Sequence, residues 1–187
     1  MNKRFNAPEK YKPGDILLTA KEIDTRLDEI ALELISTYKN KNLLLVGLLT
    51  GASWLTVDIL YRLHILGLTD CELAFIKVSS YTNGTKATQK PLITYNSITS
   101  PKNRTLLLVD DIADTGRTLT AVIRHFKNKK VTDIKTLVLL DKPERREVLF
   151  IPDYCGFVIP NIWVQGRGLD SNGYGRGDPH IRVGPYY

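Results

Sequence analysis

The sequence has little of what supports a disulfide framework, a zinc site or a membrane anchor. Only two of its 187 residues are cysteines, Cys71 and Cys155, and they lie far apart without a CxxC pair or a partnered histidine. This spacing argues against both disulfide and zinc stabilisation. The longest strongly apolar run, residues 43–49, is much shorter than the ~20 residues that span a bilayer, and the polar N-terminus leads into no signal-peptide core. We therefore predict a cytoplasmic protein with no membrane partner.

Composition and charge narrow the class of protein further. Hydrophobic residues make up 43% of the chain and charged residues 25%, as in an ordinary globular protein, and the length predicts one domain over residues 1–187. The net charge of +6 suits either nucleic acid or small phosphorylated molecules. The densest basic clusters, residues 127–130 and Arg145-Arg146, lack the interleaved aromatics of a single-strand binding surface. We expect both clusters on solvated faces and do not expect a nucleic-acid partner.

Hydrophobic periodicity predicts strands that alternate with helices. A capping box at Thr19–Glu22 begins a helix that extends to about Tyr38, and further helices are predicted over about 55–66 and 115–128. Apolar runs predict strands over residues 43–49, 71–80, 92–95, 105–109, 134–140, 154–159 and 163–165. Strands that are apolar throughout indicate a mainly parallel sheet covered on both faces. The tail 166–184, rich in glycine, is predicted to hold little regular structure.

Ligands of such sheets bind beyond the carboxyl ends of the strands. The loops that start at Thr50, Ser80, Asp110 and Asp141 should therefore converge on one site. The polar, glycine-containing segment 80–90 is interpreted as a lid over that site, with an ordinary hairpin loop as the alternative.

The most informative segment is residues 106–119. An apolar strand is followed by Asp110, Asp111 and Asp114, then by Thr115-Gly116-Arg117-Thr118 and a helix. Such a turn offers backbone N–H groups, hydroxyls and a positive helix end, which together bind a phosphate. The two carboxylates at the strand end suit ribose hydroxyls or magnesium. A Walker B strand is the alternative, but no GxxxxGK[ST] phosphate loop accompanies it.

Residues 109–118 (VDDIADTGRT) resemble the phosphoribosyl-pyrophosphate (PRPP) signature of the type I phosphoribosyltransferases. Other matches narrow the resemblance to the hypoxanthine-guanine phosphoribosyltransferases: Thr50-Gly51, Ser80-Tyr81, residues 140–143, 152–157 and 159–161, and Gly168-Leu169-Asp170. The resemblance implies an α/β fold with a mainly parallel sheet flanked by helices, a core over about 40–145, and a small hood from about 1–20 and 150–187. It also implies a cis peptide bond between Leu49 and Thr50.

The resemblance assigns a role to each residue of the phosphoribosyl site. Asp114 is implied as the general base or acid at the purine N7, a role that needs only a carboxylate within hydrogen-bond reach. The residues implied to hold the PRPP 5′-phosphate and ribose are Asp110, Asp111, Thr115, Gly116, Arg117 and Thr118. Those implied to bind pyrophosphate are Thr50, Gly51, Ser80, Tyr81 and Arg176. Magnesium is the implied cofactor, with Asp110, Asp111 and Asp170 as its ligands.

The base pocket implied by the resemblance suits a 6-oxopurine. Lys142 offers a donor to the 6-oxo group, Trp163 a stacking face, and the carbonyl of Val164 an acceptor for N1–H or a 2-amino group. Asp170 completes the implied purine set. Adenine would place its 6-amino donor against Lys142, at a cost of roughly 1–3 kcal/mol for each unpaired group.

The implied activity is transfer of the 5-phosphoribosyl group from PRPP to hypoxanthine or guanine, with xanthine as a further candidate, in a homodimer or homotetramer. A regulator that senses PRPP or nucleotides while binding RNA or DNA is the alternative, and an orotate or other pyrimidine transferase is the third. Thr50, Gln165 and Arg167 depart from the family pattern. One hypothesis is that Gln165 or Arg167 donates to the 2-oxo group of xanthine.

Overall fold

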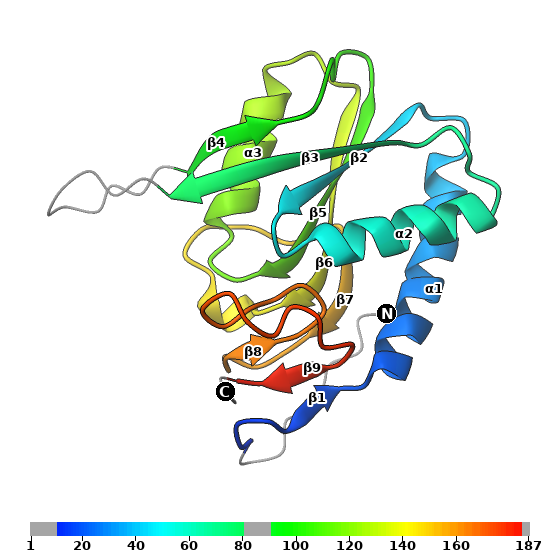
Figure 1. Cartoon of the computed structure of the whole chain (residues 1–187). Coiled ribbons are helices and arrows are strands. Elements are labelled where there is room, and N and C mark those ends of the chain that lie inside the picture. Colours follow the sequence, from blue (N-terminus) through cyan, green and yellow to red (C-terminus); the bar gives the residue numbers. More distant parts are fainter. Residues whose placement is uncertain (1–10, 81–90, 185–187) are drawn as a thin grey trace, which may run out of the picture.

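The computed structural model describes residues 11–80 and 91–184 (Figure 1). Its helices are α1 (Ala20–Tyr38), α2 (Ser53–Ile65), α3 (Arg117–Lys127) and the short 3-10 helix η1 (Pro143–Arg145). Its strands are β1 (Ile16–Leu18), β2 (Leu43–Leu49), β3 (Glu72–Ser80), β4 (Pro91–Asn96), β5 (Thr105–Ala113), β6 (Asp133–Asp141), β7 (Tyr154–Val158), β8 (Val164–Gln165) and β9 (Ile181–Val183). Over the described ranges, no helix combines the length and the hydrophobicity needed to cross a membrane.

Six strands form one mixed sheet in the order β4-β3-β2-β5-β6-β7. Every neighbouring pair is parallel except β3 and β4, which are antiparallel. The central strand β2 reads LLLVGLL and is buried along almost its whole length, as expected for a strand covered on both faces. The prediction of a mainly parallel sheet is confirmed.

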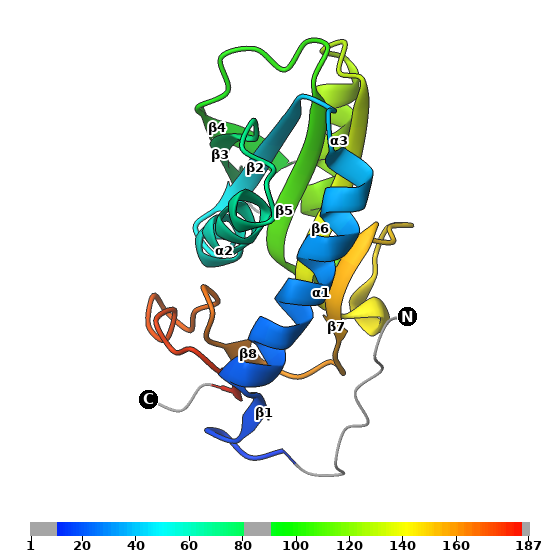
Figure 2. The ribbon, with the colours of Figure 1, turned by 90° about the vertical axis from the view of Figure 1, so that its right-hand side faces the viewer.

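The two faces of this sheet carry separate hydrophobic cores. One core joins α1 and α2 to the sheet through residues such as Ile30, Ile59 and Leu45. The other packs α3 against the opposite face, with Phe126 and Leu44 fully buried. Figure 2 shows α2 and α3 on opposite sides of the sheet. Burial on both faces fixes the edge at which the parallel strands end.

A second, three-stranded sheet forms the hood below those carboxyl ends (Figure 1). It has the order β1-β9-β8, so the N-terminal and C-terminal segments pair directly, with Ile16 opposite Arg182. Strand β9 is the one strand that the structure assigns within residues 166–184, in agreement with the prediction that this tail holds little regular structure. Strand β7 belongs to the large sheet, beside β6, so the hood begins after Val158 rather than near residue 150.

Two strands extend further than the sequence predicted. Strand β5 continues to Ala113 and β6 to Asp141, because the two pair in parallel register up to that point. Asp110 and Asp111 therefore lie within β5, and the loop that was expected to start at Asp110 starts at Asp114. The ladder holds both carboxylates on a rigid element.

Candidate active site

The segment that joins β5 to α3 surrounds a cavity of about 340 Å³. Six of the predicted phosphoribosyl residues line it: Asp110, Asp111, Asp114, Thr115, Gly116 and Thr118. Arg117 does not, because its side chain is half-exposed and pairs with Glu147 at 2.5 Å. The structure thus brings this predicted set together, apart from the Arg117 side chain.

Gly116 gives the loop its turn into α3. Its φ of 80° lies in the left-handed region, and a Cβ at this position would lie only 2.9 Å from Cβ of Phe150. The Gly116 carbonyl accepts from Thr120 N at 3.1 Å, which begins the helix. The N-terminus of α3 is therefore directed at the cavity, as a phosphate site requires.

Asp110 and Asp111 are the most perturbed acids of this cavity. Burial, followed by repulsion from Asp111, raises the pKa of the Asp110 carboxyl well above its usual range. Burial also raises the pKa of Asp111, although hydrogen bonds and the nearby charge of Arg176 oppose that rise. Two adjacent, half-buried carboxylates suit a cationic or hydroxyl-bearing ligand, which would relieve their desolvation and repulsion.

The third predicted magnesium ligand is engaged elsewhere. Oδ1 of Asp170 pairs with Arg176 at 2.6 Å, and Oδ2 accepts from Gly173 N at 2.7 Å. Among the described residues, no three His, Cys, Asp or Glu side chains group closely enough to hold a metal ion. The donor set fits a magnesium ion held by one or two carboxylates together with substrate oxygens, as is usual for this ion.

A second cavity, of about 210 Å³, lies between the carboxyl ends of β5 and β6 and the hood. Its lining contains all the predicted purine residues, namely Lys142, Trp163, Val164 and Asp170, together with Asp111, Ile112, Asp114 and Leu169. Trp163 keeps 58% of its surface exposed, so its ring is available to a ligand. Residues from three separate segments thus meet in one pocket.

Lys142 is the one buried amine of this pocket. Lys142 directly follows the last residue of β6 and is buried. Its backbone N–H donates to the Ala113 carbonyl at 2.9 Å. Burial lowers the pKa of the ammonium group, while the charge of Asp114 opposes that shift. A buried donor at a fixed position can select an acceptor on a ligand.

The two cavities share a border. Asp111, Ile112 and Asp114 line both of them. Asp111 and Asp114 are therefore the two acids at the boundary between the cavities.

Three of the five predicted pyrophosphate residues, Thr50, Gly51 and Arg176, lie around a third segment, the turn after β2. The Leu49–Thr50 bond is cis, as the resemblance implied. Gly51 lies against the Asp111 carboxylate, because a Cβ on Gly51 would lie 1.7 Å from Oδ2 of Asp111. Arg176 acts on the same carboxylate through its charge. Ser80 is the last residue of β3, whereas Tyr81 and the rest of the predicted lid lie outside the described residues.

Sequence reasoning missed two arginines beside the site. Arg145 pairs with Asp114, with Nε 3.1 Å from Oδ1. Arg146 is largely buried, donates to the carbonyls of Ala113 (2.8 Å) and Asp114, and pairs with Asp141. The prediction of a solvated face is therefore wrong for Arg146. Arg146 belongs to the loop that follows Asp141 at the end of β6, and this position could have indicated a place beside the site.

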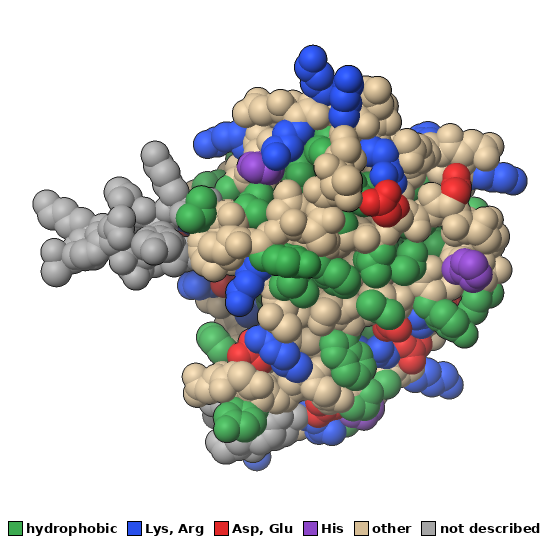
Figure 3. All heavy atoms as spheres, turned by 45° about the horizontal axis from the view of Figure 1, so that its top comes forward, with side chains coloured by type: hydrophobic (Ala, Val, Ile, Leu, Met, Phe, Trp, Pro, Cys, Tyr) green, Lys and Arg blue, Asp and Glu red, His purple; other side chains and the backbone are tan. Residues whose placement is uncertain are grey.

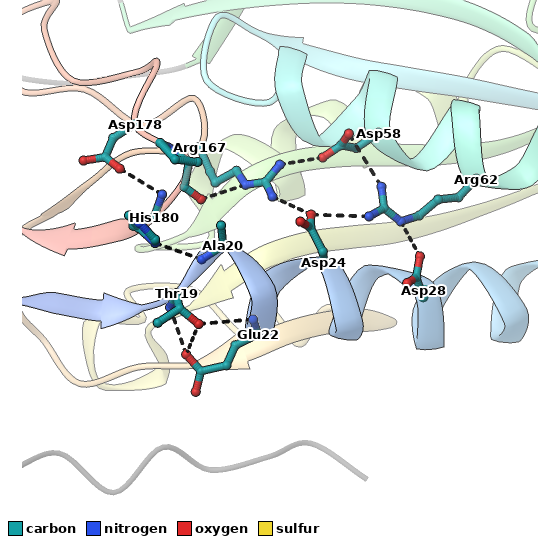
Figure 4. A network of polar contacts seen from close by, with 11 residues as sticks. Thr19, Ala20, Glu22, Asp24, Asp28, Asp58, Arg62, Arg167, Asp178 and His180 are labelled. Atoms are coloured by element: carbon teal, nitrogen blue, oxygen red, sulfur yellow. Dashed lines mark hydrogen bonds and ion pairs between the residues drawn. The ribbon is translucent and has the colours of Figure 1, made fainter.

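The structure also contradicts the hypothesis about xanthine. Gln165 is fully buried, and Arg167 is directed toward α1 and α2 (Figure 4). Neither is among the described residues that line the base cavity. A donor to a 2-oxo group therefore has to come from another residue.

Comparison with known proteins decides the family. The sequence profile described as "Phosphoribosyl transferase domain" matches residues 14–172. The chain belongs to the phosphoribosyltransferase family. Within it, the Bacillus subtilis hypoxanthine-guanine phosphoribosyltransferase is 34% identical over 174 residues, with 93% of this chain and 94% of the relative covered. The alignment thus covers nearly the whole of both phosphoribosyltransferases.

Longer relatives and solved structures match this phosphoribosyltransferase as well. The Listeria innocua bifunctional protein TilS/HprT is 37% identical over 168 residues, which cover 90% of this chain but 25% of that protein. The chain thus spans about a quarter of the length of this relative. A Trypanosoma cruzi hypoxanthine phosphoribosyl transferase superimposes with a TM-score of 0.85 at 33% identity, with 94% of each chain covered. A Staphylococcus aureus hypoxanthine phosphoribosyltransferase superimposes with a TM-score of 0.83 at 32% sequence identity, with 90% of each chain covered.

Proposed function

We propose that this protein transfers the 5-phosphoribosyl group from PRPP to N9 of hypoxanthine or guanine, giving IMP or GMP and pyrophosphate. The observation that carries the proposal is the common border of the two cavities at Asp114. The lining of one cavity suits a phosphate and a ribose, and the lining of the other suits a purine. A nucleoside monophosphate is the product that occupies both at once. The names of the relatives support the same substrates.

The reaction joins N9 of the purine to C1′ of PRPP as the bond from C1′ to pyrophosphate breaks. The purine loses one proton at N7. Of the two acids that line both cavities, Asp111 lies against Gly51 on the pyrophosphate side, so we assign Asp114 to accept this proton. Arg145, 3.1 Å from this carboxylate, holds it in place in the free protein. The proposal therefore gives Asp114 the general-base role and Arg145 a positioning role.

Donors and acceptors of the base cavity select a 6-oxopurine. Lys142 donates to the 6-oxo group, Trp163 stacks on the ring, and the Val164 carbonyl accepts from N1–H. Asp170 lines the same cavity and orients Arg176 through their ion pair of 2.6 Å. Adenine would present a donor where this pocket has one, so it is expected to be a poor substrate.

The other cavity holds the phosphoribosyl part of PRPP. Backbone N–H groups at the start of α3 and the hydroxyls of Thr115 and Thr118 bind the 5′-phosphate, and Asp110 and Asp111 bind the ribose hydroxyls. The chemistry that magnesium supplies when bound is neutralisation of charge on the departing pyrophosphate. Asp110 and Asp111 are the residues proposed to hold it, because Asp170 is engaged by Arg176 and by Gly173 N. Thr50, Gly51, Ser80, Tyr81 and Arg176 are proposed to contact the pyrophosphate itself.

The proposal is tested by product formation from PRPP and magnesium with hypoxanthine, guanine, xanthine, adenine and orotate in parallel. We expect a nucleoside monophosphate and pyrophosphate in equal amounts from the 6-oxopurines alone. Efficient use of adenine or orotate would contradict the base assignment. Retained PRPP binding without turnover of any base would favour the alternative, a nucleic-acid-binding regulator, which salt-dependent RNA or DNA binding then tests.

We further propose that the protein acts in the cytoplasm as a homodimer or homotetramer. An exposed hollow of about 510 Å³ lies between α1 and α2. Its apolar lining includes Leu32, Tyr61, Ile65 and Leu66, and its charged lining consists of Asp24, Asp28, Asp58 and Arg62. Figure 3 shows hydrophobic side chains across the middle of the face that carries α2. Such a patch suits a second copy of the chain. Sedimentation of the wild type and of Tyr61→Ser tests the assembly, since a monomeric wild type contradicts it.

A further inference from the structure

Arg167, a departure from the family pattern, is held by both of the helices beside the sheet. Its guanidinium pairs with Asp24 of α1 at 2.5 Å and with Asp58 of α2 at 2.9 Å (Figure 4). Its Nε donates to the Pro179 carbonyl at 3.0 Å, and its backbone N–H donates to Asp178 O at 2.8 Å. The residue is only 9% exposed. The side chain is therefore a link between the hood loop and the helix pair.

One anchor of Arg167, Asp58, lies on the helix that follows the predicted pyrophosphate turn. Asp58 belongs to α2, which begins at Ser53, immediately after the turn that contains Gly51. Arg62, one turn further along α2, pairs with Asp24 and with Asp28 of α1. Arg62 thus joins the two helices to each other, whereas Arg167 joins them to the hood.

The residue after Arg167 contacts the turn directly. Gly168 has φ 100°, and a Cβ on it would lie 1.9 Å from the carbonyl oxygen of Gly51. Gly51 in turn lies against the Asp111 carboxylate. The turn is therefore enclosed between the hood and strand β5, and any shift of Gly168 reaches Gly51.

Gly168 also holds Arg176. Its N–H donates to the Arg176 carbonyl at 3.0 Å, and its own carbonyl accepts from Nη1 of Arg176 at 2.5 Å. The other nitrogen of this guanidinium pairs with Asp170. Both sides of the proposed pyrophosphate subsite, the Gly51 turn and the Arg176 side chain, thus depend on the position of residue 168.

We infer that Arg167 is a positioning residue for the pyrophosphate subsite, which it aligns by fixing Gly168 between Gly51 and Arg176. The inference rests on the proposed function, because that proposal assigns Gly51 and Arg176 to pyrophosphate. A guanidinium suits the task because its planar fork reaches two carboxylates and a carbonyl at once, which a lysine cannot do. The side chain acts through its neighbours and does not touch the substrate.

Steady-state kinetics of Arg167→Met and Arg62→Met provide the matched test. Both variants remove one arginine from the same group of carboxylates, but only Arg167 is linked to the hood. We expect Arg167→Met to raise KM for PRPP between about tenfold and a hundredfold, as small misplacements of binding groups do, with KM for hypoxanthine little changed. Arg62→Met should leave both values near those of the wild type. Arg167→Lys should fall between Arg167→Met and the wild type.

Coupling to Asp58 sharpens the test. Asp58→Asn should raise KM for PRPP in the wild-type background and add little in the Arg167→Met background, because Asp58 acts on the hood through Arg167. Asp58 also pairs with Arg62 at 3.6 Å, and the Arg62→Met variant measures the effect of losing that second pair. If Arg167→Met does not fold, Asp58→Asn carries the same comparison against Arg62→Met. Equal KM values for PRPP in the Arg167→Met and Arg62→Met variants would overturn the inference. An equal rise in both substrates' KM would also overturn it, because that indicates general loosening.

Hydrogen exchange of the free protein separates this inference from the proposed function. Arg167→Met should speed amide exchange in peptides that cover residues 48–53 and 168–176, whereas Arg62→Met should not. If the wild type fails to use PRPP, the proposed function fails, but the exchange comparison still judges the positioning role. Unchanged exchange in Arg167→Met would overturn it in either case.

Discussion

The two sides of the site are built in different ways. The phosphate side comes from one continuous segment, β5 and the start of α3, whose residues 110–118 provide most of one cavity. The base and pyrophosphate side is assembled from the turn after β2, the end of β6 and the hood. A continuous segment transmits its geometry through the backbone, whereas an assembled side depends on tertiary contacts. Substitutions should therefore affect the two sides differently.

The largest effect is expected at Asp114, where the two sides meet. Asp114→Asn removes the proton acceptor but keeps the size of the side chain, so kcat should fall by about 10²–10⁴-fold with PRPP affinity largely retained. Steady-state kinetics and PRPP titration check this prediction. Arg145→Met, which removes the partner of Asp114 alone, is the control and should lose much less activity. An unchanged kcat in Asp114→Asn would refute the role.

The assembled side should be sensitive to one added methyl group. In Gly168→Ala the new Cβ would lie 1.9 Å from the Gly51 carbonyl, so the hood must shift, and we expect KM for PRPP to rise by about tenfold or more. Gly173→Ala is the matched control, because Gly173 also has a positive φ, of 89°, but has nothing within 4 Å of the new Cβ. Equal KM values in the two variants would show that backbone strain alone is responsible.

Trp163→Ala tests whether the hood holds the base. Loss of the stacking face should raise KM for hypoxanthine by about tenfold, since base stacking contributes roughly 1–3 kcal/mol, and leave KM for PRPP near its wild-type value. Trp54→Ala is the control, as Trp54 is 42% exposed on α2 and is not among the described residues that line either cavity. A hypoxanthine KM that does not move would place the ring outside the base site.

The smallest effect is expected at Asp110, on the continuous side. Burial and repulsion from Asp111 disfavour its charge, so Asp110→Asn should raise the melting temperature of the free protein at neutral pH while weakening PRPP binding. The rise should be roughly 2–4 °C for each kcal/mol of relief, measured by calorimetry. Glu144→Gln, which removes one exposed acidic charge, should leave the melting temperature unchanged. A less stable Asp110→Asn protein would contradict the account.

The same contrast explains what the sequence predicted well. The PRPP-like segment and its helix were correctly placed, because its residues are neighbours in the chain and its strand is apolar throughout. Only the predicted end of the strand was wrong. Strand β5 continues to Ala113 because it stays paired with β6 up to that residue. The five residues predicted to meet at the base, including Asp114, line one cavity.

The contacts that were missed are those between distant segments. The three-residue strands β1 and β9 exist because they pair with each other across the whole chain, which no local pattern reveals. Arg167 meets partners 143 and 109 residues away, so its role depended on the fold. Arg146 donates to backbone carbonyls 32 and 33 residues earlier in the chain. Because every residue has a backbone carbonyl, the sequence cannot show which of them an arginine binds.

Ligand titration by calorimetry tests the central claim, that the two cavities meet at Asp114 to hold one nucleotide. GMP should occupy both cavities, and PRPP should occupy only the phosphoribosyl side. The account predicts that Trp163→Ala weakens the binding of GMP but not that of PRPP, whereas Thr118→Val weakens the binding of both ligands. GMP affinity that is unchanged in Trp163→Ala, or PRPP affinity that is unchanged in Thr118→Val, would contradict the account.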